Sequence, residues 1–145
     1  MESSDRNFPN ISHLWPGWTI VRRLGRGSYG SVYEANYQYG EIVNQAAIKV
    51  VEVPTNREFV GTRKAEGFSN QDIMKALEQE RDACVSEIRC MMELQGQSNV
   101  VYIYDFQVVP KENEMGWNIW IRMELLHELS SLSGNHFFEE YQVLR

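Results

Sequence analysis

Three glycines between Leu24 and Tyr33, in the stretch LGRGSYGSVY, have a spacing that could hold a phosphate. Glycines in the pattern GxGxxG let a backbone approach phosphate oxygens closely, because no Cβ stands in the way. The same spacing occurs in several unrelated nucleotide sites and by chance in turns. The residues that follow the glycines must therefore decide which kind of site this is.

Two kinds of nucleotide site do not fit the residues after the glycines. A Rossmann unit needs a helix there, whose N-terminus holds the pyrophosphate, whereas residues 31–37 are rich in Val and Tyr and predict a strand. A P-loop ends in Gly-Lys-Ser or Gly-Lys-Thr, whereas Gly30 is followed by Ser31 and Val32. What remains is a hairpin of two strands with the glycines at its bend.

A second residue that could do chemistry is Lys49, which stands in the apolar stretch AAIKVVEV. A buried ammonium without an anionic partner is costly or loses its proton. Glu80 and Glu87 lie on the apolar stripe of a predicted helix, about 10 Å apart along its axis, so one lysine cannot pair closely with both. The alternative is a long side chain that runs over the sheet surface to solvent.

The remaining patterns predict the elements that position these residues. Strands are predicted at residues 18–24, 31–37, 46–53, 100–109 and 117–126. A helix is predicted to begin after Ser69 as its N-cap, with Asp72 in its first turn and a stop near Gly96. Residues 55–67 are interpreted as a loop, and residues 137–144 as the start of another helix. This order predicts an α+β fold, in which a helix packs on a five-stranded antiparallel sheet.

Composition and charge exclude several classes of protein. The net charge is -6, and no basic patch is present, so we expect no nucleic-acid binding. No apolar run approaches membrane-spanning length, and residues 1–10 are too polar for a signal peptide, so we expect no membrane segment and a cytoplasmic location. Cys84 and Cys90 point apart on the predicted helix, so neither a disulfide nor a zinc site is expected.

In the order of these motifs the chain resembles the N-terminal lobe of a eukaryotic-type (Hanks-type) Ser/Thr protein kinase, most closely the bacterial members. The matching segments are GRGSYGSV for the glycine-rich loop, AAIK for the strand motif VAIK, EIRCMMELQGQSNVVYIYDF for the C-helix and the next strand, and IRMELL for the fifth strand and hinge. The resemblance implies a polar tail at residues 1–14, a kinase N-lobe at residues 15–126 and an incomplete start of the C-lobe at residues 127–145.

The resemblance implies a role for each matching residue. Lys49 would bind the α- and β-phosphates of ATP, and the spacing within the C-helix motif selects Glu87 rather than Glu80 to hold the lysine. Met123 would be the gatekeeper at the back of the pocket. The other implied ATP-binding positions are the loop residues Gly25, Gly27, Ser28 and Gly30, the adenine ceiling Val32 and Ala47, and the hinge residues Glu124 and Leu126.

The 145 residues contain neither an HRD nor a DFG motif, and Asp105 in YIYDF precedes the hinge. The magnesium ligands and the catalytic Asp of the family are therefore missing, and we expect the chain alone to be inactive, with Mg²⁺ and a protein substrate bound only by an intact enzyme. The alternatives are a non-catalytic nucleotide-binding module and an interaction module that self-associates. Self-association would use an exposed face with Phe137, Phe138, Tyr141, Val143 and Leu144.

Overall fold

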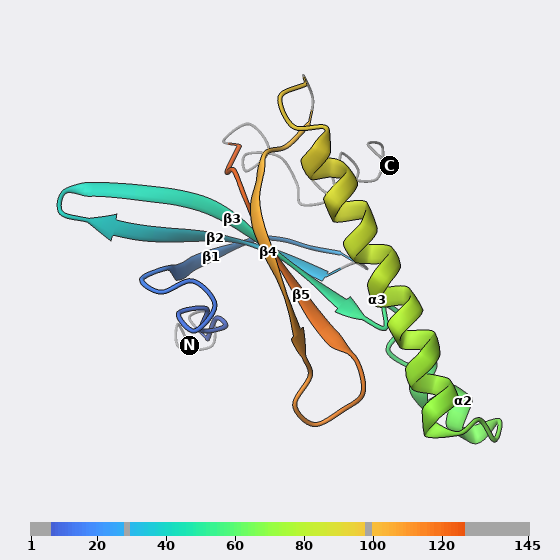
Figure 1. Cartoon of the computed structure of the whole chain (residues 1–145). Coiled ribbons are helices and arrows are strands. Elements are labelled where there is room, and N and C mark those ends of the chain that lie inside the picture. The colour runs from blue at the N-terminus through green and yellow to red at the C-terminus, as the bar shows by residue number, and fades with distance from the viewer. Residues whose placement is uncertain (1–6, 28–29, 98–99, 127–145) are drawn as a thin grey trace.

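The structure is a computed structural model that describes residues 7–27, 30–97 and 100–126. Five strands and two helices follow one another in this part of the chain (Figure 1). They are β1 (Thr19–Gly27), β2 (Gly30–Tyr39), β3 (Ile42–Val53), α2 (Phe59–Ala65), α3 (Asn70–Glu93), β4 (Ile103–Pro110) and β5 (Trp117–Met123). The predicted α+β class and the five-stranded antiparallel sheet are confirmed.

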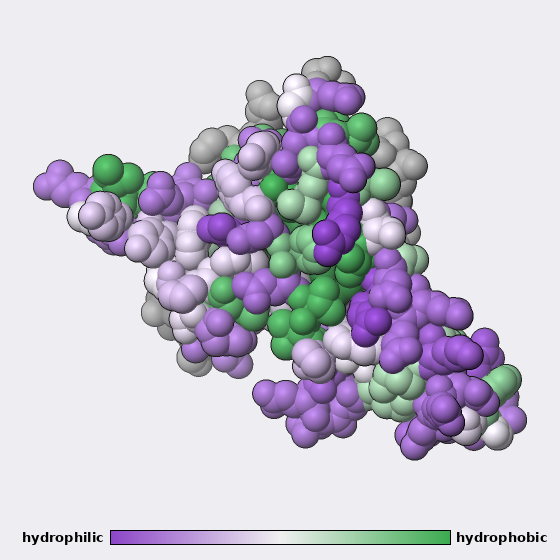
Figure 2. All heavy atoms as spheres, viewed as in Figure 1, coloured by the Kyte–Doolittle hydropathy of each residue, from purple (hydrophilic) through white to green (hydrophobic). Residues whose placement is uncertain are grey.

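The strands form one sheet in the order β1-β2-β3-β5-β4, and every neighbouring pair is antiparallel. The β2–β3 hairpin projects well beyond the other strands (Figure 1). Its tip exposes Tyr39 and Ile42, and Figure 2 shows hydrophobic atoms at the end of this projection. The same view is mostly hydrophilic over α2 and the adjoining end of α3.

The two faces of the sheet are covered by different parts of the chain. On the first, which we call the helix face, α3 packs on the strands, and the buried side chains include Val32, Ala47, Ile88, Met91, Ile119, Ile121 and Met123. On the second, which we call the outer face, the segment before β1 packs on the strands, with the buried side chains Ile11, Trp15, Ile20, Tyr33, Ala35 and Ile48. The residues that are predicted to bind a nucleotide must be sorted between these faces.

Helix α3 begins where the sequence predicts. The Ser69 hydroxyl accepts a hydrogen bond of 3.1 Å from the backbone N–H of Asp72, which makes Ser69 the N-cap. The buried residues of the helix are Ile73, Leu77, Ile88 and Met91, all members of the predicted apolar stripe. The cap fixes where the helix begins, and Ile88 and Met91 of the stripe pack in the cluster on the helix face.

The structure corrects several predicted boundaries. Residues 55–67 are not all loop, because they contain α2, a helix with no buried residue of its own. The Arg63 guanidinium lies 5.0 Å from the ring centre of Phe59 and 5.5 Å from that of Phe68, so local cation–π contacts stabilise a helix that has no apolar stripe to reveal it. β4 begins at Ile103 rather than at residue 100, and β5 ends at Met123 rather than at residue 126.

Packing against the sheet begins before residue 15. Ile11 is 1% exposed, and Phe8 and Leu14 are partly buried beside it on the outer face. The Trp15 indole N–H donates a hydrogen bond of 3.1 Å to the Asp105 carboxylate, which ties this segment to β4. The predicted start of a C-lobe at residues 127–145, with its helical stretch at residues 137–144, lies outside the described residues.

Candidate functional site

Lys49 is buried in β3 and only 4% exposed. It lies directly opposite Val32 of β2 and Ile121 of β5, both of which belong to the cluster under α3. Directly opposed residues of antiparallel strands share a face, so the Lys49 side chain projects from the helix face. This burial argues against the alternative in which the side chain runs over the sheet to solvent.

The two glutamates of α3 that are candidate partners of Lys49 differ in what surrounds them. The Glu80 carboxylate accepts two hydrogen bonds from Thr55, one of 2.9 Å from its backbone N–H and one of 2.7 Å from its hydroxyl. Glu80 therefore anchors the chain that leaves β3, which favours Glu87 as the partner of the lysine. Glu87 immediately precedes the buried Ile88, but its own side chain is exposed, so it lies at the margin of the apolar stripe and not on it. The pairing of Lys49 with Glu87 stays a prediction.

The glycine hairpin joins β1 and β2, as expected. Gly25 lies opposite Val32, and Gly27 lies opposite Gly30. Gly30 has a φ of +135°, and a Cβ at this position would lie 1.7 Å from the carbonyl oxygen of Val50. The close approach of β2 to β3 thus requires a glycine here, with or without a phosphate nearby. Ser28 lies outside the described residues.

The residues predicted to surround adenine lie together on the helix face. Ala47 is opposite Met123 across β3 and β5, and both belong to the same cluster as Val32. Val32 is 1% exposed, and Ala47 and Met123 are 0% exposed. A ligand could contact these side chains only if the chain that covers them moved aside, so the structure is closed at this point.

The predicted hinge residues follow β5 directly. The backbone N–H of Glu124 donates a hydrogen bond of 2.8 Å to the carbonyl oxygen of Tyr102, and the Glu124 carboxylate accepts one of 2.8 Å from the Tyr102 N–H. Leu126 is partly buried against the cluster on the helix face. The structure therefore brings the hinge residues beside the residues predicted to contact adenine.

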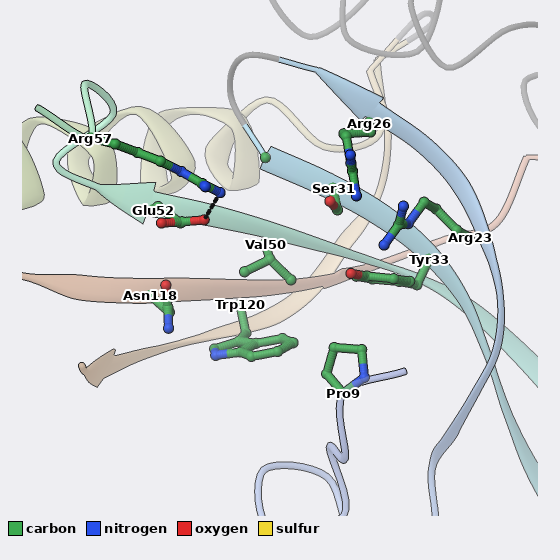
Figure 3. A pocket seen from close by; sticks show the side chains of 11 residues that line it. Pro9, Arg23, Arg26, Ser31, Tyr33, Val50, Glu52, Arg57, Asn118 and Trp120 are labelled. Carbon is green, nitrogen blue, oxygen red and sulfur yellow. Dashed lines mark hydrogen bonds and ion pairs between the residues drawn. The ribbon is translucent and has the colours of Figure 1, made fainter. Parts of the chain in front are cut away.

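The outer face of the sheet contains a hollow that was not predicted from the sequence. Arg23, Arg26 and Arg57 line a hollow of about 520 Å³ on the outer face, together with Glu52 and Trp120 among others (Figure 3). The residues come from β1, β2, β3, β5 and the flanking segments, so no single stretch of sequence marks the hollow. The only feature of the sequence that hints at the hollow is the presence of two arginines, Arg23 and Arg26, close to the glycines of the loop.

Glu52, at the edge of this hollow, is held by two cations. Its carboxylate lies 3.0 Å from the guanidinium of Arg57 and 3.2 Å from the ammonium of Lys111. Partial burial acts to raise the pKa of the Glu52 carboxyl, but Lys111 and Arg57 together outweigh it and hold the pKa below its ordinary value of 4.5. Glu52 is therefore a charged link between β3 and two loops.

Within residues 7–27, 30–97 and 100–126, no three His, Cys, Asp or Glu side chains are grouped so that they could hold a metal ion. Cys84 is half-buried and Cys90 is exposed, and neither is part of a disulfide. Neither described helix has the length and apolar character needed to cross a membrane.

Comparison with known proteins adds no family assignment. No protein-family model matches the chain, and a search of the curated proteins gives no match either.

Proposed function

We propose that the chain is the ATP-binding lobe of a protein Ser/Thr kinase, which in the intact enzyme transfers a phosphoryl group from ATP to protein hydroxyls. One observation carries the proposal, namely the burial of Lys49 on the helix face beside β2, the second of the two strands that the glycine loop joins. A lysine is almost never fully buried unless it is paired, so a lysine in the middle of a sheet is an informative observation.

The chemistry that this chain would supply is the binding and orientation of phosphates. A cation in an enclosed, weakly polar site attracts phosphate oxygens more strongly than the same cation in water. Lys49 would provide this charge, and the Gly25–Gly30 loop would provide backbone N–H groups above it. The resemblance assigns the Mg²⁺ ligands to the part of the intact enzyme that carries the HRD and DFG motifs.

Nucleotide binding would include a conformational step. Val32, Ala47 and Met123 are enclosed, and Leu125 and Leu126 are among the side chains packed on their cluster. If the binding-competent state is open and only a fraction of the molecules adopt it, the apparent affinity falls in proportion to that fraction. We therefore expect weak binding of adenine nucleotides by the isolated chain, with slow association.

The proposal is tested by titration of the 145-residue chain with ADP in a calorimeter. Lys49→Met should abolish measurable binding, because methionine keeps the volume of the side chain and removes its charge. Lys75→Met is the matched control, since Lys75 is exposed on α3, and it should bind as the wild type does. Equal affinities of wild type and Lys49→Met would contradict the proposal.

The same experiment separates the proposal from an interaction module. Absence of ADP binding to the wild type, together with a stable dimer in sedimentation, would favour an interaction module that self-associates. ADP binding that depends on Lys49 is common to a kinase lobe and to a non-catalytic nucleotide module. Those two are distinguished by whether phosphoryl transfer to a protein acceptor appears when the HRD and DFG motifs are supplied on the same polypeptide.

A further inference from the structure

The hollow on the outer face has the size of a ligand site. Its volume of about 520 Å³ falls in the range of small-molecule pockets, about 300–1,000 Å³. The lining alternates with the predicted nucleotide residues along the same strands, because Ser31 and Tyr33 flank Val32, and Val50 follows Lys49. The hollow is thus separate from the helix face and independent of the proposed function.

The charged part of the lining is strongly cationic. Three arginines and one carboxylate line the hollow, an excess of two positive charges in a chain whose net charge is -6. Arg57 is matched by Glu52, whereas neither Arg23 nor Arg26 forms an ion pair with a carboxylate of the described residues. Two guanidinium groups therefore remain available for an external anion.

The register of the β1–β2 pair places both arginines beside residues that line the hollow. Arg26 lies opposite Ser31, and Arg23 lies opposite Tyr33, across the β1–β2 pair. Figure 3 shows both guanidinium groups extending over the hollow from β1, with the Ser31 hydroxyl beneath Arg26. A hydroxyl and two planar cations on one rim are suited to the oxygens of a phosphate, which guanidinium groups bind in a bidentate manner.

Part of the remaining lining is apolar, beside the polar Asn118. Val50 lies opposite Trp120 across β3 and β5, and both side chains face the hollow in Figure 3, with Pro9 on the same side. The Arg23 guanidinium lies 5.8 Å from the centre of the Tyr33 ring, which keeps this arginine close to an aromatic wall. A planar ring of a ligand would pack on this surface while its charged group met the arginines.

We propose that this arginine hollow binds a small phosphate monoester that carries a planar ring. The dianionic phosphate matches the two unpaired guanidinium groups, and the ring matches the surface of Trp120, Val50 and Pro9. A free aryl phosphate fits the volume of the hollow. A phosphorylated tyrosine of a peptide has the same chemistry, and the test below distinguishes the two sources.

The test is calorimetric titration of the full 145-residue chain with phenyl phosphate at low ionic strength. For a ligand of this size we expect a dissociation constant of about 1 mM or tighter. Arg23→Gln combined with Arg26→Gln should weaken binding at least about tenfold, and Arg23→Lys with Arg26→Lys should give an intermediate loss, because lysine keeps the charge without the planar fork. Arg23 and Arg26 are both exposed, and thermal unfolding of each variant checks that it folds.

Two control variants remove positive charge from other places, one from exposed lysines of the helices and one from the helix face of the sheet. Lys64→Gln with Lys75→Gln changes two exposed lysines on α2 and α3 and should bind phenyl phosphate as the wild type does. Lys49→Met should also bind it normally, so that failure of the nucleotide proposal and failure of this one are distinguishable. Loss of binding in the lysine pair equal to that in the arginine pair would overturn the proposal.

Two further ligands decide what the hollow recognises. Inorganic phosphate should bind several-fold more weakly than phenyl phosphate, because it lacks the ring, and phenol should show no measurable binding. Equal affinity for phosphate and phenyl phosphate, or no binding of phenyl phosphate at all, would overturn the proposal. Much tighter binding of a phosphotyrosine peptide than of phenyl phosphate would overturn the small-molecule assignment and identify a peptide site.

Discussion

Lys49 and Val50 are neighbours in β3 and point to opposite faces of the sheet. Lys49 projects from the helix face, into the cluster that α3 covers, whereas Val50 lines the arginine hollow on the outer face. The alternation of side chains along a strand thus places neighbouring residues of one short segment on two separate faces. Substitutions on one face can therefore be used as controls for the other.

Because β2 approaches β3 closely at Gly30, we expect a larger residue at this position to destabilise the protein whether or not a ligand is bound. Gly30→Ala should lower the free energy of unfolding by at least about 2 kcal/mol, because its Cβ would overlap the carbonyl oxygen of Val50 at a positive φ. Gly61→Ala, in α2 with open space around it, is the control and should be neutral or stabilising by about 0.5–1 kcal/mol. Chemical denaturation without nucleotide measures both, and equal stabilities of the two variants would contradict this explanation.

The contribution of the Ser69 N-cap of α3 to the stability of the protein should be measurable by itself. Ser69→Ala removes the acceptor of the Asp72 N–H and should destabilise the protein by about 1 kcal/mol. Ser86 is exposed in the middle of the same helix, so Ser86→Ala should change the stability by no more than about 0.5 kcal/mol. Urea denaturation of both variants is sufficient, and a cost for Ser86→Ala as large as that for Ser69→Ala would show that the cap contributes nothing.

The ion pairs of Glu52 predict a dependence of stability on pH. The pKa of Glu52 is lower in the folded protein than its ordinary value of 4.5, so at acidic pH the unfolded chain takes up a proton first. The stabilisation is complete above the ordinary pKa and is lost as the pH falls through the folded-state pKa.

The comparison of Glu52→Gln with the wild type isolates this contribution. Between about pH 5.5 and pH 3 the free energy of unfolding should fall less steeply in Glu52→Gln, because the variant has no carboxyl to protonate. Glu112→Gln, on the exposed turn between β4 and β5, is the matched variant for the loss of one acidic group. Parallel curves for wild type and Glu52→Gln would contradict the role of the ion pairs with Arg57 and Lys111.

Sequence patterns predicted the elements whose signal is local. The strand around Lys49, the apolar stripe of α3 and the Ser69 cap all correspond to what the structure contains. The short helix α2 was missed because it buries no side chain and so has no periodic apolar pattern. The arginine hollow was missed because Arg23, Trp120 and Pro9 meet only after the strands take the order β1-β2-β3-β5-β4.

The glycines show where a sequence signal is ambiguous. The GxGxxG spacing was interpreted as a phosphate-binding backbone, but the close approach of Val50 is by itself enough to require a glycine at position 30. Gly30 therefore gives less support to nucleotide binding than its place in the motif implies. The buried charge of Lys49 has no such packing explanation, and for this reason the functional proposal depends on it.

The most direct measurement is a methyl-resolved NMR titration of the 145-residue chain with ADP. The nucleotide proposal predicts that the methyl signals of Val32, Ala47 and Met123, on the helix face, shift in proportion to the ADP bound. It also predicts that the methyl signals of Ile48 and Val50, on the outer face, stay in place. Shifts confined to Ile48 and Val50, or no shift of any of these five signals at saturating ADP, would contradict nucleotide binding on the helix face.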